Sequence, residues 1–158
     1  MDVKIKGPWE LQKIHNWLGE NRYPLRVACV GDDGYPRVVS LWFTFRDGKF
    51  HCVSHRDSPL VKLLRKAPKV GFEISPNQPP YCGVRGQGDA VLSSDGAADN
   101  LLLAIDRYLG DGNQSLATWL LSRVDEEVTI TITPSRFFSW DYRSRMDDKE
   151  TQQAVPAD

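Results

Sequence analysis

Closely spaced hairpin signals in the first third of the chain constrain its fold more than any other feature. The extended segments Leu25–Val30, Pro36–Phe45 and Lys49–Ser54 are separated by turn-forming residues at 31–34 and by Asp47-Gly48. An Asp-Gly pair between apolar runs is typical of a hairpin because both residues tolerate a left-handed backbone. These segments therefore predict three antiparallel strands in a meander.

The rest of the chain alternates helical and extended patterns. Trp9, Ile14 and Trp17 follow helical spacing near the N-terminus, and Ser58-Pro59 is typical of an N-cap followed by the first residue of a helix. The other expected elements are strands at Lys69–Ser75, Tyr81–Leu92, Val128–Thr133 and Phe137–Tyr142, and helices at Ala97–Leu109 and Gln114–Arg123. This order predicts a mainly β fold, a barrel decorated with helices, in place of a doubly wound parallel sheet. We expect residues 1–145 to form a single domain and 146–158 a disordered polar tail.

Composition excludes several classes of function. The chain has 158 residues, 20 Lys+Arg, 21 Asp+Glu and a net charge of −1, so no global field would recruit nucleic acid or an anionic membrane. The N-terminal stretch lacks the apolar core of a signal peptide or a membrane span. Three separate cysteines without a CxxC pair favour a reducing cytoplasm. His51 and His55 lack an evident third ligand, and we predict no metal site.

The second strand of the meander carries the first candidate site. Its residues are Arg37, Val38, Val39, Ser40, Leu41 and Trp42. A guanidinium at the start of an apolar strand suits a phosphate, and extended backbone groups can bind the polar edge of a flat heterocycle. The alternative is a solvent-facing arginine that follows a turn.

The second candidate site lies where the third strand ends and a helix begins. Val53 and Ser54 end the strand, Ser58 precedes the helix, and Lys62 follows one turn into it. Unpaired amides and the helix dipole favour an anion at such a position. Ser58 is also expected to act as an ordinary N-cap, which does not exclude contact with a phosphate.

Two further segments could contribute. Gly83, Gly86 and Gly88 lie within one strand, where glycine marks either a bulge or close approach of a ligand. Trp140 belongs to an aromatic and basic cluster near the C-terminus and is expected either in the core or stacked on a ring.

Taken in order, these segments resemble the pyridoxamine 5'-phosphate oxidase-like family of FMN-binding split β-barrels. The likeness extends over about Leu25–Leu92 and, more loosely, to Arg145. It implies a split β-barrel that dimerises with shared cofactor sites. It also implies that Arg37, Ser54, Ser58 and Lys62 hold the FMN phosphate and that Val38, Val39, Ser40, Leu41 and Trp42 line the ring. Val53, with Ser54, falls where the family has a Tyr-Thr pair and is expected to bind the cofactor, and Trp140 is expected to approach the ring from the partner subunit.

The chain departs from the family pattern at two places. Pro59-Leu60 stands where the family has an Arg-Lys pair, and Lys62 is the nearest substitute. No histidine follows Trp140 as it does in the true oxidase, so pyridoxamine phosphate is not the expected substrate. The resemblance implies an FMN-dependent oxidoreductase acting on an unidentified small molecule. A deazaflavin-dependent reductase on the same fold and a non-catalytic flavin-binding dimer remain alternatives; the catalytic residues are not identified.

Overall fold

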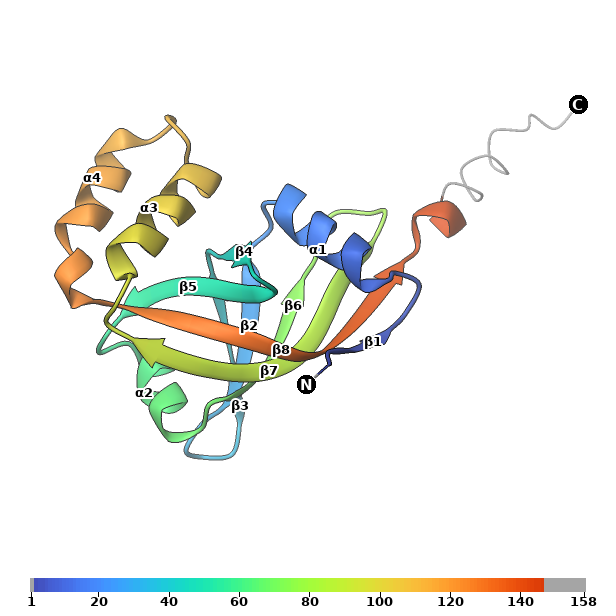
Figure 1. Cartoon of the computed structure of the whole chain (residues 1–158), viewed down its shortest axis with the longest axis horizontal. Helices are drawn as coiled ribbons and strands as arrows, with labels where there is room; N and C mark the ends of the chain where they lie inside the picture. The colour runs from blue at the N-terminus through green and yellow to red at the C-terminus, as the bar shows by residue number, and fades with distance from the viewer. Residues whose placement is uncertain (1, 147–158) are drawn as a thin grey trace, which may run out of the picture.

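The computed structural model describes residues 2–146, whose centre is one strongly curled sheet (Figure 1). The strand order is β3-β2-β6-β7-β8-β5-β4; these neighbours are antiparallel, and β1 adds to β8 in parallel. The strands are β1 (Lys4–Lys6), β2 (Leu25–Val30), β3 (Pro36–Leu41), β4 (Thr44–Arg46), β5 (Lys49–His55), β6 (Lys69–Ile74), β7 (Cys82–Ser93) and β8 (Glu127–Asp141). The predicted mainly β architecture is confirmed. Apart from Met146, the expected tail lies outside the described residues.

The helices cover the ends and one side of this sheet. They are α1 (Leu11–Glu20), α2 (Pro59–Lys66), α3 (Ala97–Tyr108), α4 (Gln114–Ser122) and the short 3-10 helix η1 (Val124–Glu126). Helices α3 and α4 form a hairpin inserted between β7 and β8, and this hairpin projects from the body of the barrel (Figure 1). Within residues 2–146 no helix is long and apolar enough to span a bilayer.

Aromatic rings fill the interior of the barrel. Phe50 is fully buried, and its ring centroid lies 5.0 Å from that of Phe72, 5.3 Å from Phe43 and 6.4 Å from Phe137. These residues come from β5, β6, the β3–β4 connection and β8. Because edge-to-face and tilted pairs of this kind add to the free energy gained by burial, the cluster stabilises the interior that the curled sheet encloses.

Glycines allow β7 to approach β8 closely. A Cβ atom at Gly86 would overlap the Arg136 carbonyl oxygen, and one at Gly83 would lie 2.6 Å from the Trp140 indole. The ladder also shifts register between Gln87 and Gly88. The glycine-rich strand is thus explained by a bulge and by packing within the protomer, one of the two expectations from the sequence.

Local signals at α2 gave the right prediction. Ser58 is the N-cap, its Oγ accepts a hydrogen bond from the Val61 amide at 3.2 Å, and Pro59 occupies the first helical position.

At the other side of the barrel, the Arg107 guanidinium of α3 donates to the carbonyl oxygens of Leu18 at 2.8 Å and Gly19 at 2.9 Å. These bonds satisfy the last carbonyls of α1 and tie the two helices together.

The structure differs from the sequence prediction in three elements. Strand β1 was not predicted. The expected strand Pro36–Phe45 is interrupted at Trp42 and Phe43, where the chain passes from β3 to β4. The two expected C-terminal strands are one strand, β8, because Pro134 pairs with Gly88 beside the bulge, where a missing amide donor is tolerated.

Asp141 anchors the N-terminal segment to the end of β8. Its carboxylate accepts hydrogen bonds from the buried Trp9 indole at 3.2 Å and from Arg143 Nε at 2.9 Å. The bonds from Arg143 are the main cause that lowers the pKa of Asp141 from 3.8 to about 2. A carboxyl whose pKa is lower in the folded state than in the unfolded state stabilises the fold fully when the pH is above the unfolded-state pKa. This contribution is lost as the pH falls through the folded-state pKa.

We predict that Asp141→Asn lowers the free energy of unfolding at pH 7 by about 1–2 kcal/mol, because it removes charge-assisted hydrogen bonds. The difference from wild type should shrink as the pH falls from about 4 toward 2, as measured by urea denaturation across that range. Asp89→Asn is the matched control, because Asp89 is exposed and pairs only with exposed Lys69 at 3.2 Å. An equal loss in both variants would contradict the prediction.

Candidate functional site

A cavity of about 360 Å³ opens between the end of β3, the middle of β5 and the α3–α4 hairpin. Its lining is mostly apolar, with one hydroxyl and one carboxylate. The lining residues are Ser40, Leu41, Trp42, Val53, Leu101, Leu116, Leu120 and Glu127. Four of the residues predicted from the sequence to bind the cofactor (Ser40, Leu41, Trp42 and Val53) therefore lie together around one cavity.

Trp42 forms a fixed wall of this cavity. Its indole stacks on the Tyr108 ring with centroids 5.3 Å apart and planes 6° apart. The Tyr108 hydroxyl donates to the Tyr23 carbonyl at 3.0 Å and accepts from the Phe43 amide at 3.4 Å. Burial raises the pKa of Tyr108, so the phenol remains a neutral donor. The break between β3 and β4 thus places an aromatic surface at the cavity.

The facing wall comes from residues that sequence reasoning missed. Leu101 lies on α3, while Leu116 and Leu120 lie one turn apart on α4. No residue of α4 is fully buried, although the helix is rich in leucine. The spacing of these leucines predicts an apolar helix face but does not indicate what that face covers. Glu127, the first residue of β8, was also missed.

Glu127 is the ionisable side chain among the described residues that line the cavity. Burial raises the pKa of its carboxyl, while the charges of His55 and Arg123 act in the opposite direction and the charge of Glu126 adds to the rise. The net direction is upward. A carboxyl in this environment holds a proton at a higher pH than an exposed glutamate does.

Two hydroxyls meet beside the start of α2. The Oγ atoms of Ser54 and Ser58 lie 3.0 Å apart, and that of Ser58 also caps the helix. Ser54 follows Val53 in β5, so its side chain points to the opposite face of the sheet, and neither Ser54 nor Ser58 lines the cavity. Lys62 is exposed on the second turn of α2. This arrangement offers hydroxyl donors and a cation close to a helix N-terminus.

Arg37 lies at the opposite end of β3 from the cavity. Its guanidinium donates to Asp33 at 2.8 Å and to the Tyr35 carbonyl at 3.3 Å. The hydrogen bond to Asp33 is the main cause that raises the pKa of Arg37. The same turn carries Asp32, which pairs with Lys66 of α2 at 3.0 Å. Helix α2 and the turn that holds Arg37 are therefore neighbours on one side of the barrel.

The remaining predicted residues are divided between the two faces of the sheet. Val39 packs against the core, whereas Val38 is 67% exposed on the outer face. Trp140 lies near the far end of β8 from Glu127, beside Gly83 of β7. Within one protomer the structure does not bring Trp140 to the cavity, so a role at the ring would need a second copy of the chain.

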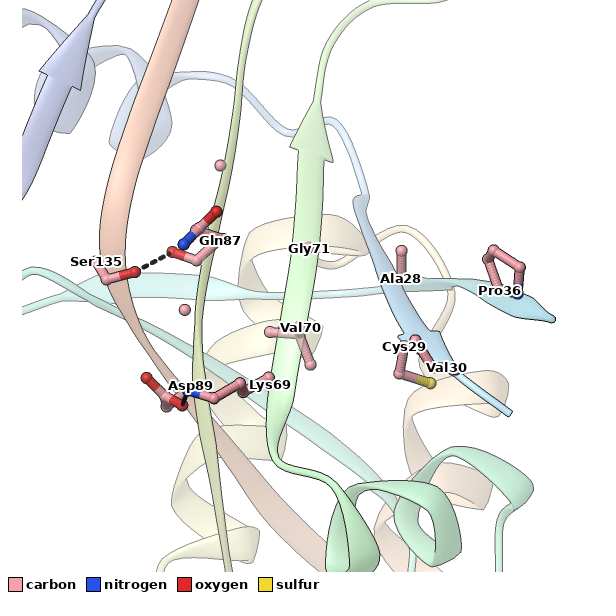
Figure 2. A pocket seen from close by; sticks show the side chains of 12 residues that line it. Ala28, Cys29, Val30, Pro36, Lys69, Val70, Gly71, Gln87, Asp89 and Ser135 are labelled. Carbon is pink, nitrogen blue, oxygen red and sulfur yellow. Dashed lines mark hydrogen bonds and ion pairs between the residues drawn. The ribbon is translucent and has the colours of Figure 1, made fainter. Parts of the chain in front are cut away.

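A second hollow, of about 460 Å³, lies on the outer face of β2, β6 and β7 (Figure 2). Ala28 and Gly71 form its floor, and their small side chains create the depression. Lys69 and Asp89 pair at its edge at 3.2 Å, and Ser135 donates to the Gln87 carbonyl at 3.3 Å. Gly86 and Gly88, which the sequence marked for either a bulge or approach of a ligand, line this hollow, whereas the residues predicted to hold FMN do not.

Comparisons with known proteins identify the fold. No family model and no curated protein matches the chain. Among solved structures, a conserved hypothetical protein from Mycobacterium tuberculosis is 19% identical, with a TM-score of 0.72 over 100% of this chain and 96% of that one. An F420 reductase is 21% identical, with a TM-score of 0.63 over 83% of this chain and 98% of that one. A putative pyridoxamine 5'-phosphate oxidase from Listeria innocua is 18% identical, with a TM-score of 0.57 over 81% of this chain and 96% of that one.

These similarities confirm the fold class predicted from the sequence, a mainly β split barrel like that of pyridoxamine 5'-phosphate oxidase-like proteins. They concern the fold, and the chemistry has to be argued from the site itself.

We predict that Tyr108→Phe lowers the free energy of unfolding by about 1 kcal/mol, because it removes the donor to the Tyr23 carbonyl and leaves the Phe43 amide without its acceptor. The stacked ring is retained, so the cavity wall should stay in place. Thermal and chemical denaturation measure the change. Tyr35→Phe is the control, because Tyr35 is 70% exposed. An unchanged free energy of unfolding in Tyr108→Phe would contradict the prediction.

Proposed function

We propose that this protein is a flavin-dependent oxidoreductase that binds FMN and acts on a small-molecule substrate. The observation that carries the proposal is the convergence of Ser40, Leu41, Trp42 and Val53 around one apolar cavity. Beside it, Ser54 and Ser58 offer hydroxyls at the start of α2. A flat, largely apolar ring with a dianionic tail matches these two neighbouring environments.

The cavity fits the ring in chemical character. Leu41, Trp42 and Val53 provide apolar contacts, and the Ser40 hydroxyl is positioned to bind a polar edge. Trp42 cannot rotate freely because Tyr108 stacks on it, so the pocket is largely preformed. When bound, the flavin supplies hydride and electron transfer, and the protein contributes orientation and exclusion of water.

The phosphate would lie between α2 and β3. In this proposal the hydroxyls of Ser54 and Ser58 donate to it, and the cations of Lys62 and Arg37 neutralise it. Arg37 has to exchange its Asp33 partner for the phosphate. Both side chains of that pair are about half exposed, so little buried structure opposes the exchange.

The proposal includes a homodimer with shared cofactor sites. Trp140 is remote from the cavity of its own protomer, so it can close a ring site only from the partner. Exposed apolar side chains are available for such contacts, among them Val30, Tyr35, Val38 and Val91.

One observation favours a second candidate, a deazaflavin-dependent reductase. A solved structure described as an F420 reductase shares the fold over 83% of this chain. Pro59-Leu60 also lack the cations that the FMN-binding family places at the phosphate.

The absorbance spectrum of freshly purified protein tests the proposal directly. We expect flavin bands, or a rise in melting temperature when FMN is added to protein that carries none. Ligand at about 100 times its Kd should add about 2.7 kcal/mol of stability. Parallel titrations with FMN and F420 separate the two candidates. Absence of flavin bands together with an unchanged melting temperature for both ligands would refute the proposal.

We predict that Arg37→Ala raises the Kd for FMN by about 10- to 100-fold but changes the Kd for riboflavin little, because FMN carries the phosphate and riboflavin does not. Arg37→Lys should also bind FMN more weakly than the wild type if the guanidinium binds two phosphate oxygens. Quenching of flavin fluorescence measures the two dissociation constants. Lys69→Ala removes an equal charge at the outer hollow and should leave both ligands unaffected. Equal losses for FMN and riboflavin in Arg37→Ala would place Arg37 away from the phosphate.

A further inference from the structure

Two adjacent glutamates end η1 and begin β8, and the structure gives them different surroundings. Glu126 Oε2 lies 3.4 Å from His55 Nε2 and 3.5 Å from Arg123 Nε. The Glu127 carboxylate lines the cavity and has no hydrogen bond or ion pair with any described residue. His55 and Arg123 are therefore engaged by Glu126, which is not among the residues that line the cavity.

The geometry of His55 supports this division. Its Nδ1 accepts a hydrogen bond from the Asp57 amide at 3.1 Å. Its Nε2 lies 3.4 Å from Glu126 Oε2, so both ring nitrogens have partners other than Glu127. His55 is the cross-strand partner of Glu127 in the β5–β8 ladder, yet its polar atoms are engaged elsewhere.

The other surroundings of Glu127 are apolar or uncharged. From β3 the cavity receives Ser40, Leu41 and Trp42, and from α3 and α4 it receives three leucines. The charges that act on the Glu127 carboxyl are those of His55, Arg123 and Glu126, and burial outweighs them. A ring that fills the cavity would remove water from this carboxylate without supplying a countercharge.

We infer that Glu127 is the proton donor of the cavity. In this inference, which rests on the proposed function, its carboxylate takes one proton from solvent when a flat ring binds. The resulting O–H donates a hydrogen bond to an acceptor atom of the ring. The balance is one proton consumed per ring bound, and no electron is transferred.

The binding of riboflavin as a function of pH tests the inference. Riboflavin carries the flavin ring and lacks the phosphate, whose own titration near pH 6 would complicate measurements with FMN. We expect the Kd of the wild-type chain, measured by fluorescence quenching from pH 5 to 8, to rise with pH, approaching tenfold per unit at the steepest point.

Glu127→Gln keeps the size and the hydrogen-bonding capacity of the side chain but does not titrate, so its riboflavin Kd should be independent of pH. Asp125→Asn is the matched control, because Asp125 is exposed on η1 and its charge is not among those that act on Glu127, so it should retain the wild-type dependence. A flat wild-type profile, or a pH dependence that persists in Glu127→Gln or disappears in Asp125→Asn, would overturn the inference. If Glu127→Gln does not fold, the wild-type profile and the proton uptake of the wild type decide.

The two proposals fail in distinguishable ways. If neither riboflavin nor FMN binds at any pH, the proposed flavin site is refuted, and so is the role of Glu127. Riboflavin that binds equally well at every pH would refute the role of Glu127 alone. Proton uptake measured by calorimetry in buffers of different ionisation enthalpy provides an independent readout, with uptake expected in the wild type and absent in Glu127→Gln.

Discussion

The pairing of β7 with β8 is the constraint on which the rest of the structure depends. These are the longest strands of the described chain, and β8 also pairs with β1 and β5. Glycines let the two backbones approach closely, and the bulge beside Gly88 bends the ribbon. The curl of the barrel and the positions of both ends of β8 follow from this pairing, so a side chain larger than hydrogen at Gly86 would disturb the whole sheet.

The cavity is a consequence of how that ribbon is connected. The chain leaves β7, forms the α3–α4 hairpin and returns to start β8, so the helices stand over the same end of the barrel as Glu127. Arg107 fastens α3 to α1 at the other end of the helix. Helix α4 has no such anchor and no fully buried residue. One wall of the cavity is thus fixed by β3 and Trp42, and the other depends on a helix with few contacts.

Local chemistry explains why much of the fold could be predicted from the sequence. Asp47-Gly48 forms its hairpin, Ser58-Pro59 starts its helix, and the alternation at 128–133 marks a strand, because each signal acts within a few residues. Strand β1 has no such signal, since its three residues are extended only through parallel pairing with β8. Pro134 indicated a break, and only the bulge on the neighbouring strand shows why β8 continues through it.

The candidate site could be predicted from the sequence only in part. Ser40, Leu41, Trp42 and Val53 do meet at one cavity, but not through the predicted meander. The expected second strand breaks at Trp42, so β4 pairs with β5 while β3 pairs with β2, and β3 and β5 meet only because the sheet curls. Leu116, Leu120 and Glu127 reach it through the placement of an inserted helical hairpin, which no local pattern specifies. The roles of Arg37, Ser54, Ser58, Lys62 and Trp140 in cofactor binding remain predictions.

The two ion pairs at the turn between β2 and β3 bear on the charge of the proposed ligand. Asp32 and Asp33 compensate Lys66 and Arg37, so these four side chains carry no net charge. In the proposed site, an anion would compete with two carboxylates held at high local concentration. A singly charged anion would gain little from that exchange, whereas a doubly charged group would attract the released cations more strongly than one carboxylate does. The corner would therefore discriminate by charge number before any specific contact is made.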